Sequence, residues 1–227
     1  MNFRIGHLAS IAALAGLFSL AGSADAATIT TLYNTGVDGS GNVLANGTTP
    51  DPHYTLISVP SGSTTTRIIT SAGGFPVPPY IGDNTTSRWI VPNNTPEGDN
   101  APVGTYIFRT TFDLTGFDAS TAKITGGWST DNNGLDIKIN GVSTGFTTPA
   151  NQFALGFAAF AISGNFVAGL NTLDFIVNNA AGTTGNPVAL RVEMTGEASP
   201  VPLPAAAWLL LSGLGGLGFI GRRRKAA

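Results

Sequence analysis

The chain has 227 residues, no cysteine, 11 Lys and Arg residues and 13 Asp and Glu residues, for a formal net charge of −2. Without disulfides, its stability must come from the burial of apolar surface. Between residues 27 and 200, six Lys and Arg residues stand against twelve Asp and Glu residues. This sparse, acidic charge argues against a nucleic-acid partner, which needs clustered cations. His53 is the only histidine in that stretch, which excludes His-rich metal sites.

The N-terminal stretch is typical of a secretory signal peptide. Arg4 gives it a positive start, Leu8 to Leu20 is uncharged and mostly apolar, and Ala24-Asp25-Ala26 has the small-x-small pattern of a signal-peptidase site. We therefore expect residues 1–26 to be removed, so that the mature chain begins at Ala27.

Residues 27–195 predict a single all-β domain, joined to the tail by a linker at 196–200. No stretch sustains a helical period, whereas short runs alternate apolar and polar residues between turns rich in Gly, Pro, Asn and Ser. The expected strands are Thr28 to Tyr33, His53 to Val59, Thr66 to Thr70, Ser87 to Val91, Tyr106 to Leu114, Ala122 to Trp128, Leu135 to Asn140, Phe153 to Ile162, Leu173 to Asn178 and Val188 to Met194. Phe153 to Ile162 is apolar throughout, which favours a buried strand. Strands at this spacing favour one antiparallel β-sandwich.

Four motifs in the second half of the chain follow one another in a recognisable order. A Tyr-x-Phe-x-Thr-x-Phe strand from Tyr106 to Phe112 precedes Asp131-Asn132-Asn133, Ile139-Asn140-Gly141 and finally Gly169 to Leu173. This order resembles the galactose-binding-like jelly roll of carbohydrate-binding modules and of glycosidase sugar-binding domains. The resemblance implies a jelly-roll sandwich over residues 104–195.

One cluster of residue types suits a sugar ligand. Trp128 is followed by Asp131, Asn132 and Asn133, and Trp89 is a second aromatic that a sugar platform would use. Indole rings stack on the apolar C–H faces of sugars, while Asn and Asp side chains bond the hydroxyl groups. The competing interpretation is that each Trp belongs to the hydrophobic core.

The same turn also carries candidate calcium ligands. Asp131, Asn133 and Asp136 offer oxygen atoms of the kind that calcium takes, although Asn and Asp also simply favour turns. No other cofactor is expected.

The sequence gives little support for catalysis. The stretch from Gly141 to Gly145 matches the nucleophile-elbow pattern Gly-x-Ser-x-Gly, but Asn140-Gly141 predicts a hairpin instead of a strand-to-helix turn. No pattern points to the paired carboxylates of glycoside hydrolysis. We therefore expect no enzyme activity. A polysaccharide-acting hydrolase using a carboxylate, His53 or Ser143 is the last alternative.

The tail, residues 201–227, has three parts. Val201-Pro202-Leu203-Pro204 is followed by the uncharged run Ala205 to Gly221 and then by Arg222-Arg223-Arg224-Lys225. As a helix, the uncharged run would span roughly 25 Å, just short of a bilayer's hydrocarbon core, with the basic cluster on the cytoplasmic side. This order resembles the PEP-CTERM sorting signal of exported bacterial proteins, with Leu203 where the usual Val-Pro-Glu-Pro has Glu. A plain C-terminal anchor is the alternative, but it explains neither the Pro-x-Pro pair nor the glycines.

The PEP-CTERM resemblance implies a destination and a partner. An exosortase-like membrane peptidase would recognise the tail, with residues 205–221 as a transient inner-membrane anchor, before delivery to the cell envelope or extracellular matrix. The leading hypothesis is a non-catalytic cell-surface or exopolysaccharide-matrix protein in contact with extracellular polysaccharide. The alternative is a carbohydrate-binding module with a defined sugar site near Trp128.

Overall fold

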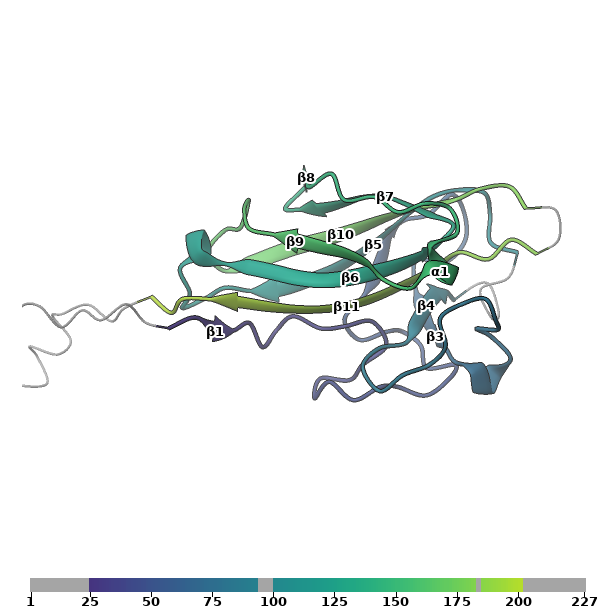
Figure 1. Ribbon diagram of the computed structural model, residues 1–227, viewed down its shortest axis with the longest axis horizontal. Helices are drawn as coiled ribbons and strands as arrows, with labels where there is room; N and C mark the ends of the chain where they lie inside the picture. The colour runs from purple at the N-terminus through teal and green to yellow at the C-terminus, as the bar shows by residue number, and fades with distance from the viewer. Residues whose placement is uncertain (1–24, 94–99, 183–184, 202–227) are drawn as a thin grey trace, which may run out of the picture. The chain divides into compact units, whose positions relative to one another are not determined.

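A computed structural model describes residues 25–93, 100–182 and 185–201, which form a sandwich of two antiparallel β-sheets (Figure 1). The strands are β1 (Ala27–Thr28), β2 (Thr55–Ser58), β3 (Thr66–Ile69), β4 (Trp89–Pro92), β5 (Gly104–Asp113), β6 (Lys123–Asp131), β7 (Asn133–Ile139), β8 (Val142–Ser143), β9 (Ala158–Ile162), β10 (Leu170–Asn179) and β11 (Ala189–Ala198). Three short helices join them: Ser71–Gly73, Ala119–Thr121 and α1 (Gln152–Leu155). The predicted all-β class and the antiparallel sandwich are therefore confirmed.

The two sheets differ in size and order. The six-stranded sheet runs β3-β4-β11-β6-β9, with β1 also paired to β11, and the five-stranded sheet runs β2-β5-β10-β7-β8. The long pairs β10–β5 and β11–β6 carry most of the ladder, from Leu170↔Asp113 to Asn179↔Gly104 and from Ala189↔Asp131 to Glu197↔Lys123. Period-two alternation in these strands turns one set of side chains inward and the other outward.

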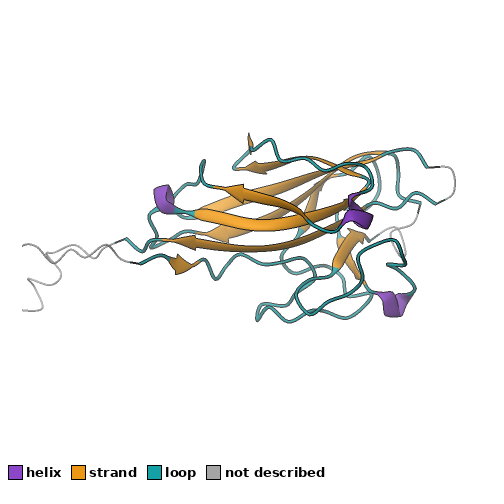
Figure 2. Ribbon diagram, in the orientation of Figure 1, coloured by secondary structure: helices purple, strands orange, loops and turns teal. Residues whose placement is uncertain are grey.

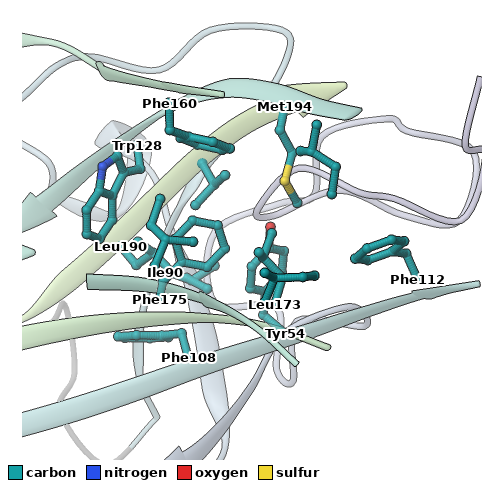
Figure 3. Close-up of a cluster of buried hydrophobic side chains, with 14 of the residues drawn as sticks. Tyr54, Ile90, Phe108, Phe112, Trp128, Phe160, Leu173, Phe175, Leu190 and Met194 are labelled. Atoms are coloured by element: carbon teal, nitrogen blue, oxygen red, sulfur yellow. The ribbon is translucent and has the colours of Figure 1, made fainter. Parts of the chain in front are cut away.

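The main core lies between the sheets and is built around Phe175 of β10 (Figure 3). Its ring centroid lies 5.8 Å from that of Trp128, 6.2 Å from that of Phe160 and 6.3 Å from that of Tyr54. Every buried hydrophobic residue in the described ranges lies between Ile29 and Ala198, and Ala26–Pro200 forms one compact unit. This segment therefore contains the whole core that its sandwich needs.

A second, smaller core covers one end of the outer face of the six-stranded sheet. Its buried members are Ile69, Trp89, Val91 and Ala189, and its covering residues are Phe75, Tyr80, Ile81 and Phe153. The strand neighbours Ile68, Ile90 and Leu190 point into the main core instead, because alternate residues face opposite sides. Figure 2 shows that much of the chain before β4 is loop, and its segment around Tyr80 supplies part of this cover.

Three expectations need correction. The stretch expected as one buried strand from Phe153 divides into α1 and β9. The β9 residues Ala159 and Ala161 are exposed because they point to the outer face, whereas Phe160 and Ile162 point into the core. Residues 196–200, expected as a linker, continue β11 to Ala198, and Pro200 bridges to Phe117. The first strand is only Ala27–Thr28.

No helix in the described ranges is both long enough and apolar enough to cross a membrane. The proposed signal-peptide residues 1–24 lie outside the described residues, and so do the predicted span 205–221 and the sorting residues Pro202, Leu203, Pro204, Arg222, Arg223 and Arg224. Ala27 begins β1 and pairs with Ala198.

Candidate functional site

The two tryptophans proposed as a sugar platform are both fully buried. Trp128 points between the sheets against Phe175, and Trp89 packs in the smaller core, where its indole N–H donates to the Ile81 carbonyl at 3.0 Å. Neither ring offers a face to a ligand, so the expectation that Trp128 and Trp89 stack on a sugar is wrong. Trp128 points into the core on the same face of β6 as Ile124, which lies four residues earlier.

The polar residues after Trp128 fasten the β6–β7 turn. The buried Asp131 carboxylate accepts bonds from the Tyr80 hydroxyl and, at 2.8 Å, from the Asn132 amide. Asn133 accepts from the Asn178 amide at 3.1 Å, and Asp136 accepts from the Gly145 N–H at 3.1 Å. Each side chain thus bonds a different neighbour. Burial raises the pKa of the Asp131 carboxyl to about 6, and the Tyr80 bond opposes the shift.

Calcium at Asp131, Asn133 and Asp136 stays a prediction. Within the described ranges, no three His, Cys, Asp or Glu residues gather as a metal site would require. The stretch from Gly141 to Gly145 forms the expected hairpin, with Ser143 paired to Lys138 across β8 and β7. His53 lies elsewhere, with its ring stacked on Tyr33 at 3.6 Å.

A shallow hollow of about 320 Å³ lies on the outer face of the six-stranded sheet. We call it the trough and define it by its lining residues Asn34, Thr86, Thr125, Gly126, Glu193, Met194 and Thr195. Strand register explains the base of the trough, because Thr195 pairs with Thr125 and Glu193 pairs with Gly127. Side chains directly opposite each other in a sheet share a face, so the two threonines lie side by side.

Glycines let the strands beneath the trough approach each other closely. A Cβ at Gly126 would lie 2.3 Å from the Glu193 carbonyl oxygen, and a Cβ at Gly127 would lie 2.7 Å from the Phe157 Cβ. On the other side, Thr125 and Gly127 pair with Ala161 and Ala159 of β9. The facing outward positions Thr125, Gly127, Ala159 and Ala161 therefore carry small side chains, and Phe157 lies next to them at Gly127.

Two loops far away in sequence form the wall of the trough. The Asn34 side chain accepts from the Met194 N–H at 2.7 Å and donates to the Thr86 carbonyl at 3.2 Å. The Asp51 carboxylate holds the same segment in place by accepting from the Gly36 N–H at 2.7 Å. These bonds fix Asn34 and Thr86 beside β11.

Glu193 is the charged group of the trough. Its carboxylate accepts from the Asn84 amide at 2.6 Å and from the Ser87 hydroxyl at 2.8 Å, and it lies 3.7 Å from the Arg191 guanidinium. Arg191 is buried beneath it, with its guanidinium carbon 5.5 Å from the centre of the Phe157 ring. Burial lowers the pKa of Arg191, and the charge of Glu193 opposes that shift.

The trough has unused hydrogen-bonding capacity. Thr86, Thr125 and Thr195 are exposed, and no group in the described ranges bonds their hydroxyls. Each hydroxyl can donate one bond and accept two. Together with the Glu193 carboxylate, they suit an uncharged ligand rich in hydroxyl groups.

Comparison with known proteins identifies the tail. Residues 200–225 match the PEP-CTERM protein-sorting motif. The tail resemblance is therefore confirmed, and the PEP-CTERM motif implies an exported protein that is transiently membrane-anchored and processed by an exosortase.

No curated protein matches the chain. Among solved structures, the chain is similar to CBM35 from Paenibacillus barcinonensis, at 16% identity and a TM-score of 0.31, over 64% of this chain and 98% of that one. It is also similar to the Podospora anserina GH26-CBM35 β-(1,4)-mannanase, at 15% identity and a TM-score of 0.29, over 67% of this chain and 29% of the mannanase.

Sequence reasoning missed the trough. A partial signal was present, because Thr125 and Glu193 fall on polar positions of two predicted strands, but the predicted strand ended at Met194, before Thr195. Nothing in the sequence indicated that Asn34 and Thr86 would lie beside them.

Proposed function

We propose that this protein is a non-catalytic, exported cell-surface or exopolysaccharide-matrix protein that binds polysaccharide in the trough. In this proposal, the sandwich is a galactose-binding-like jelly roll, residues 1–26 are a signal peptide, and residues 205–221 are a temporary inner-membrane anchor. Processing at the tail would deliver residues 27–200 to the envelope or the matrix. This proposal keeps the carbohydrate-binding role that the sequence predicts, but its site moves from Trp128 to the trough.

The observation that carries the proposal is the set of three unbonded threonine hydroxyls beside Glu193, next to a run of small outward side chains on β6 and β9. A glycan presents many hydroxyl groups that both donate and accept, and a flat run of sugar rings needs a smooth surface. Residues 27–200 carry few charged side chains, so most of the exposed polar groups are uncharged, which suits a neutral polymer.

The trough fits binding better than hydrolysis. Its lining contains one carboxylate, Glu193, whereas glycoside hydrolysis generally uses two. That carboxylate already accepts two hydrogen bonds and faces Arg191. A carboxylate already engaged in this way can accept bonds from a ligand but has no second carboxylate beside it in the trough.

Affinity electrophoresis in gels that contain neutral polysaccharides tests the proposal. The test protein is residues 26–200, and the variant combines Thr125→Val with Thr195→Val, which keeps the side-chain shape and removes both hydroxyls. Each lost bond contributes about 1 kcal/mol, so we expect roughly 10- to 30-fold weaker binding.

A matched control exists on the opposite sheet. Thr111 and Thr172 also pair directly across two strands, but they lie on the outer face of the five-stranded sheet. Replacing both with Val should leave retardation unchanged. Equal weakening by the two double variants, or no retardation of the unmodified protein by any polysaccharide tested, would overturn the proposal.

A further inference from the structure

The outer edge of β9 is free. β9 ends the six-stranded sheet and pairs only with β6, from Ile124↔Ile162 to Trp128↔Ala158 (Figure 1). Within the described ranges, no other main-chain group bonds residues 158–162. A strand at a sheet edge presents a row of N–H and C=O groups that can pair with another strand.

The other sheet edges carry features that discourage pairing, and β9 carries none. β1 and β8 have only two residues each, β2 shifts register between Leu56 and Ser58, and β3 carries a charge at Arg67. The β9 sequence is Ala-Ala-Phe-Ala-Ile, with no charge, proline or bulge. Natural proteins usually protect exposed edges with such features, so an unprotected edge of this kind indicates a pairing surface.

We propose that β9 pairs antiparallel with β9 of a second copy of this chain, about a two-fold axis at Phe160. The sequence suits this pairing because it is nearly symmetric: Ala159 would face Ala161 of the other copy, and Ala158 would face Ile162. A two-fold contact of one edge with itself closes at two chains, so it gives a dimer and no open fibre.

The side chains on each face fit this arrangement. Phe160 and Ile162 are buried in their own core, at 3% and 5% exposure, so the pairing needs no rearrangement of large side chains. On the outer face, only the exposed methyl groups of Ala159 and Ala161 meet. The outer faces of the two β9 strands therefore meet with no charge and no bulky side chain between them.

The dimer would also place two troughs on one surface. Facing residues of antiparallel strands point to the same side, so the outer faces of the two sheets become continuous. This consequence rests on the proposed function: two troughs joined across the β9 alanines would bind one polymer bivalently, which raises apparent affinity without a new contact. The β9 pairing itself does not depend on glycan binding.

Disulfide trapping tests the pairing on the full chain, which has no native cysteine. Two differently tagged copies, one with Ala159→Cys and one with Ala161→Cys, are co-expressed and exposed to mild oxidant. Directly facing residues lie about 4.5–5.5 Å apart between Cα atoms, within the range for a disulfide, whereas copies of the same residue lie on a diagonal of about 7–8 Å. We expect the mixed disulfide to exceed both same-residue disulfides.

Ala154→Cys on α1 is the control, since Ala154 is also exposed but lies outside β9. A mixed disulfide no more abundant than the control product would overturn the proposal, and so would a dominant disulfide to a different protein. Dominant same-residue disulfides would overturn the Phe160 register.

Sedimentation of residues 26–200 gives an independent measurement. The unmodified segment and Ala154→Lys should both have twice the mass of a single chain, whereas Ala161→Lys should have the mass of one chain. A single-chain mass for the unmodified segment at high micromolar concentration contradicts the pairing. Neither experiment contains glycan, so both still test the β9 pairing if the protein proves not to bind polysaccharide.

Discussion

Replacing Asp131 with Asn should stabilise the domain at neutral pH. The Asp131 carboxyl is 2% exposed, and burial raises its pKa from 3.8 to about 6, with the Tyr80 hydroxyl bond opposing the shift. At pH 7.5 the folded domain must therefore hold a buried negative charge. Asn has nearly the same shape, can still bond Tyr80 and Asn132, and never ionises.

The direction of the pH dependence follows from the two pKa values. Because the folded-state pKa lies above the unfolded-state value, the folded state binds the proton more tightly. This contribution to stability is fully present below about pH 3.8 and is lost as the pH rises through about 6. A shift of about two units corresponds to at most about 3 kcal/mol. Asp131→Asn should thus raise the free energy of unfolding by about 1–3 kcal/mol at pH 7.5 and by little at pH 4.

Urea unfolding of residues 26–200 across this pH range measures the effect. Asp136→Asn is the matched control, because Asp136 lies in the next strand and is half-buried. The difference between the Asp131→Asn variant and the unmodified protein should grow as pH rises and should exceed the effect of the control at pH 7.5. A difference that stays constant between pH 4 and pH 7.5, or a variant that is less stable at neutral pH, would refute the reasoning.

Three further predictions concern the core and the tail. Gly134→Ala should destabilise the domain by about 3 kcal/mol in urea unfolding, because its Cβ would lie 2.1 Å from the Trp128 ring. In the control Gly164→Ala, the new Cβ meets nothing within 4 Å, so this variant should be as stable as the unmodified protein. Equal effects of the two substitutions would contradict the packing. Trp128→Phe should cost roughly 1–3 kcal/mol in the same assay and leave polysaccharide retardation unchanged, and a loss of retardation in a folded variant would return the sugar site to Trp128. Epitopes placed after Pro200 and after Ala227 should separate in the producing cell, and one full-length inner-membrane species carrying both would support a plain anchor.

The strands were the most predictable part of the molecule, because alternation survives wherever one face is buried. β10 contains its predicted run, and β5, β7 and β11 each contain all but one end residue of theirs; all four strands lie in the interior of the two sheets. The prediction failed at Phe153 to Ile162, where a continuous apolar run has no alternation to read. Small alanines there are compatible with burial and with exposure, and only the sheet order shows that β9 is an edge.

The Trp128 error has a physical explanation. Indole and amide groups suit a sugar, but residue type does not say which way a strand side chain points. Trp128 shares its face with Ile124, and the intervening residues of that strand are Thr125, Gly126 and Gly127. Because Trp128 lies an even number of residues after Ile124, both side chains point to the same, buried face of the strand. This alternation is a stronger indicator of side-chain direction than the polar turn that begins three residues after Trp128.

The trough was not predictable because its wall is nonlocal. Asn34 reaches Met194 across 160 residues, and Asn84 reaches Glu193 across 109. Both bonds require β11 to be already placed between β4 and β6. These contacts depend on the order of the strands in the sheet, and that order cannot be predicted from the alternation within each strand.

The two outer faces of the sandwich differ in a way that favours the six-stranded sheet as the functional one. On the five-stranded sheet, Arg109 and Asp174 pair at 2.6 Å, and Lys138 lies opposite Asp174 on the next strand. Charges that bond one another across a sheet leave little capacity for a neutral ligand. On the six-stranded sheet, the charged pair Arg191 and Glu193 lies on β11, whereas the outward positions of β6 and of the edge strand β9 that face each other carry threonine, glycine and alanine. The same small side chains leave the hydroxyls of the trough unbonded and the β9 edge unprotected. The small side chains of β6 and β9 therefore account for both proposed surfaces. The two can still be tested separately, because removing the threonine hydroxyls affects only glycan binding in the trough, whereas a charge on β9 affects chiefly the pairing of two chains.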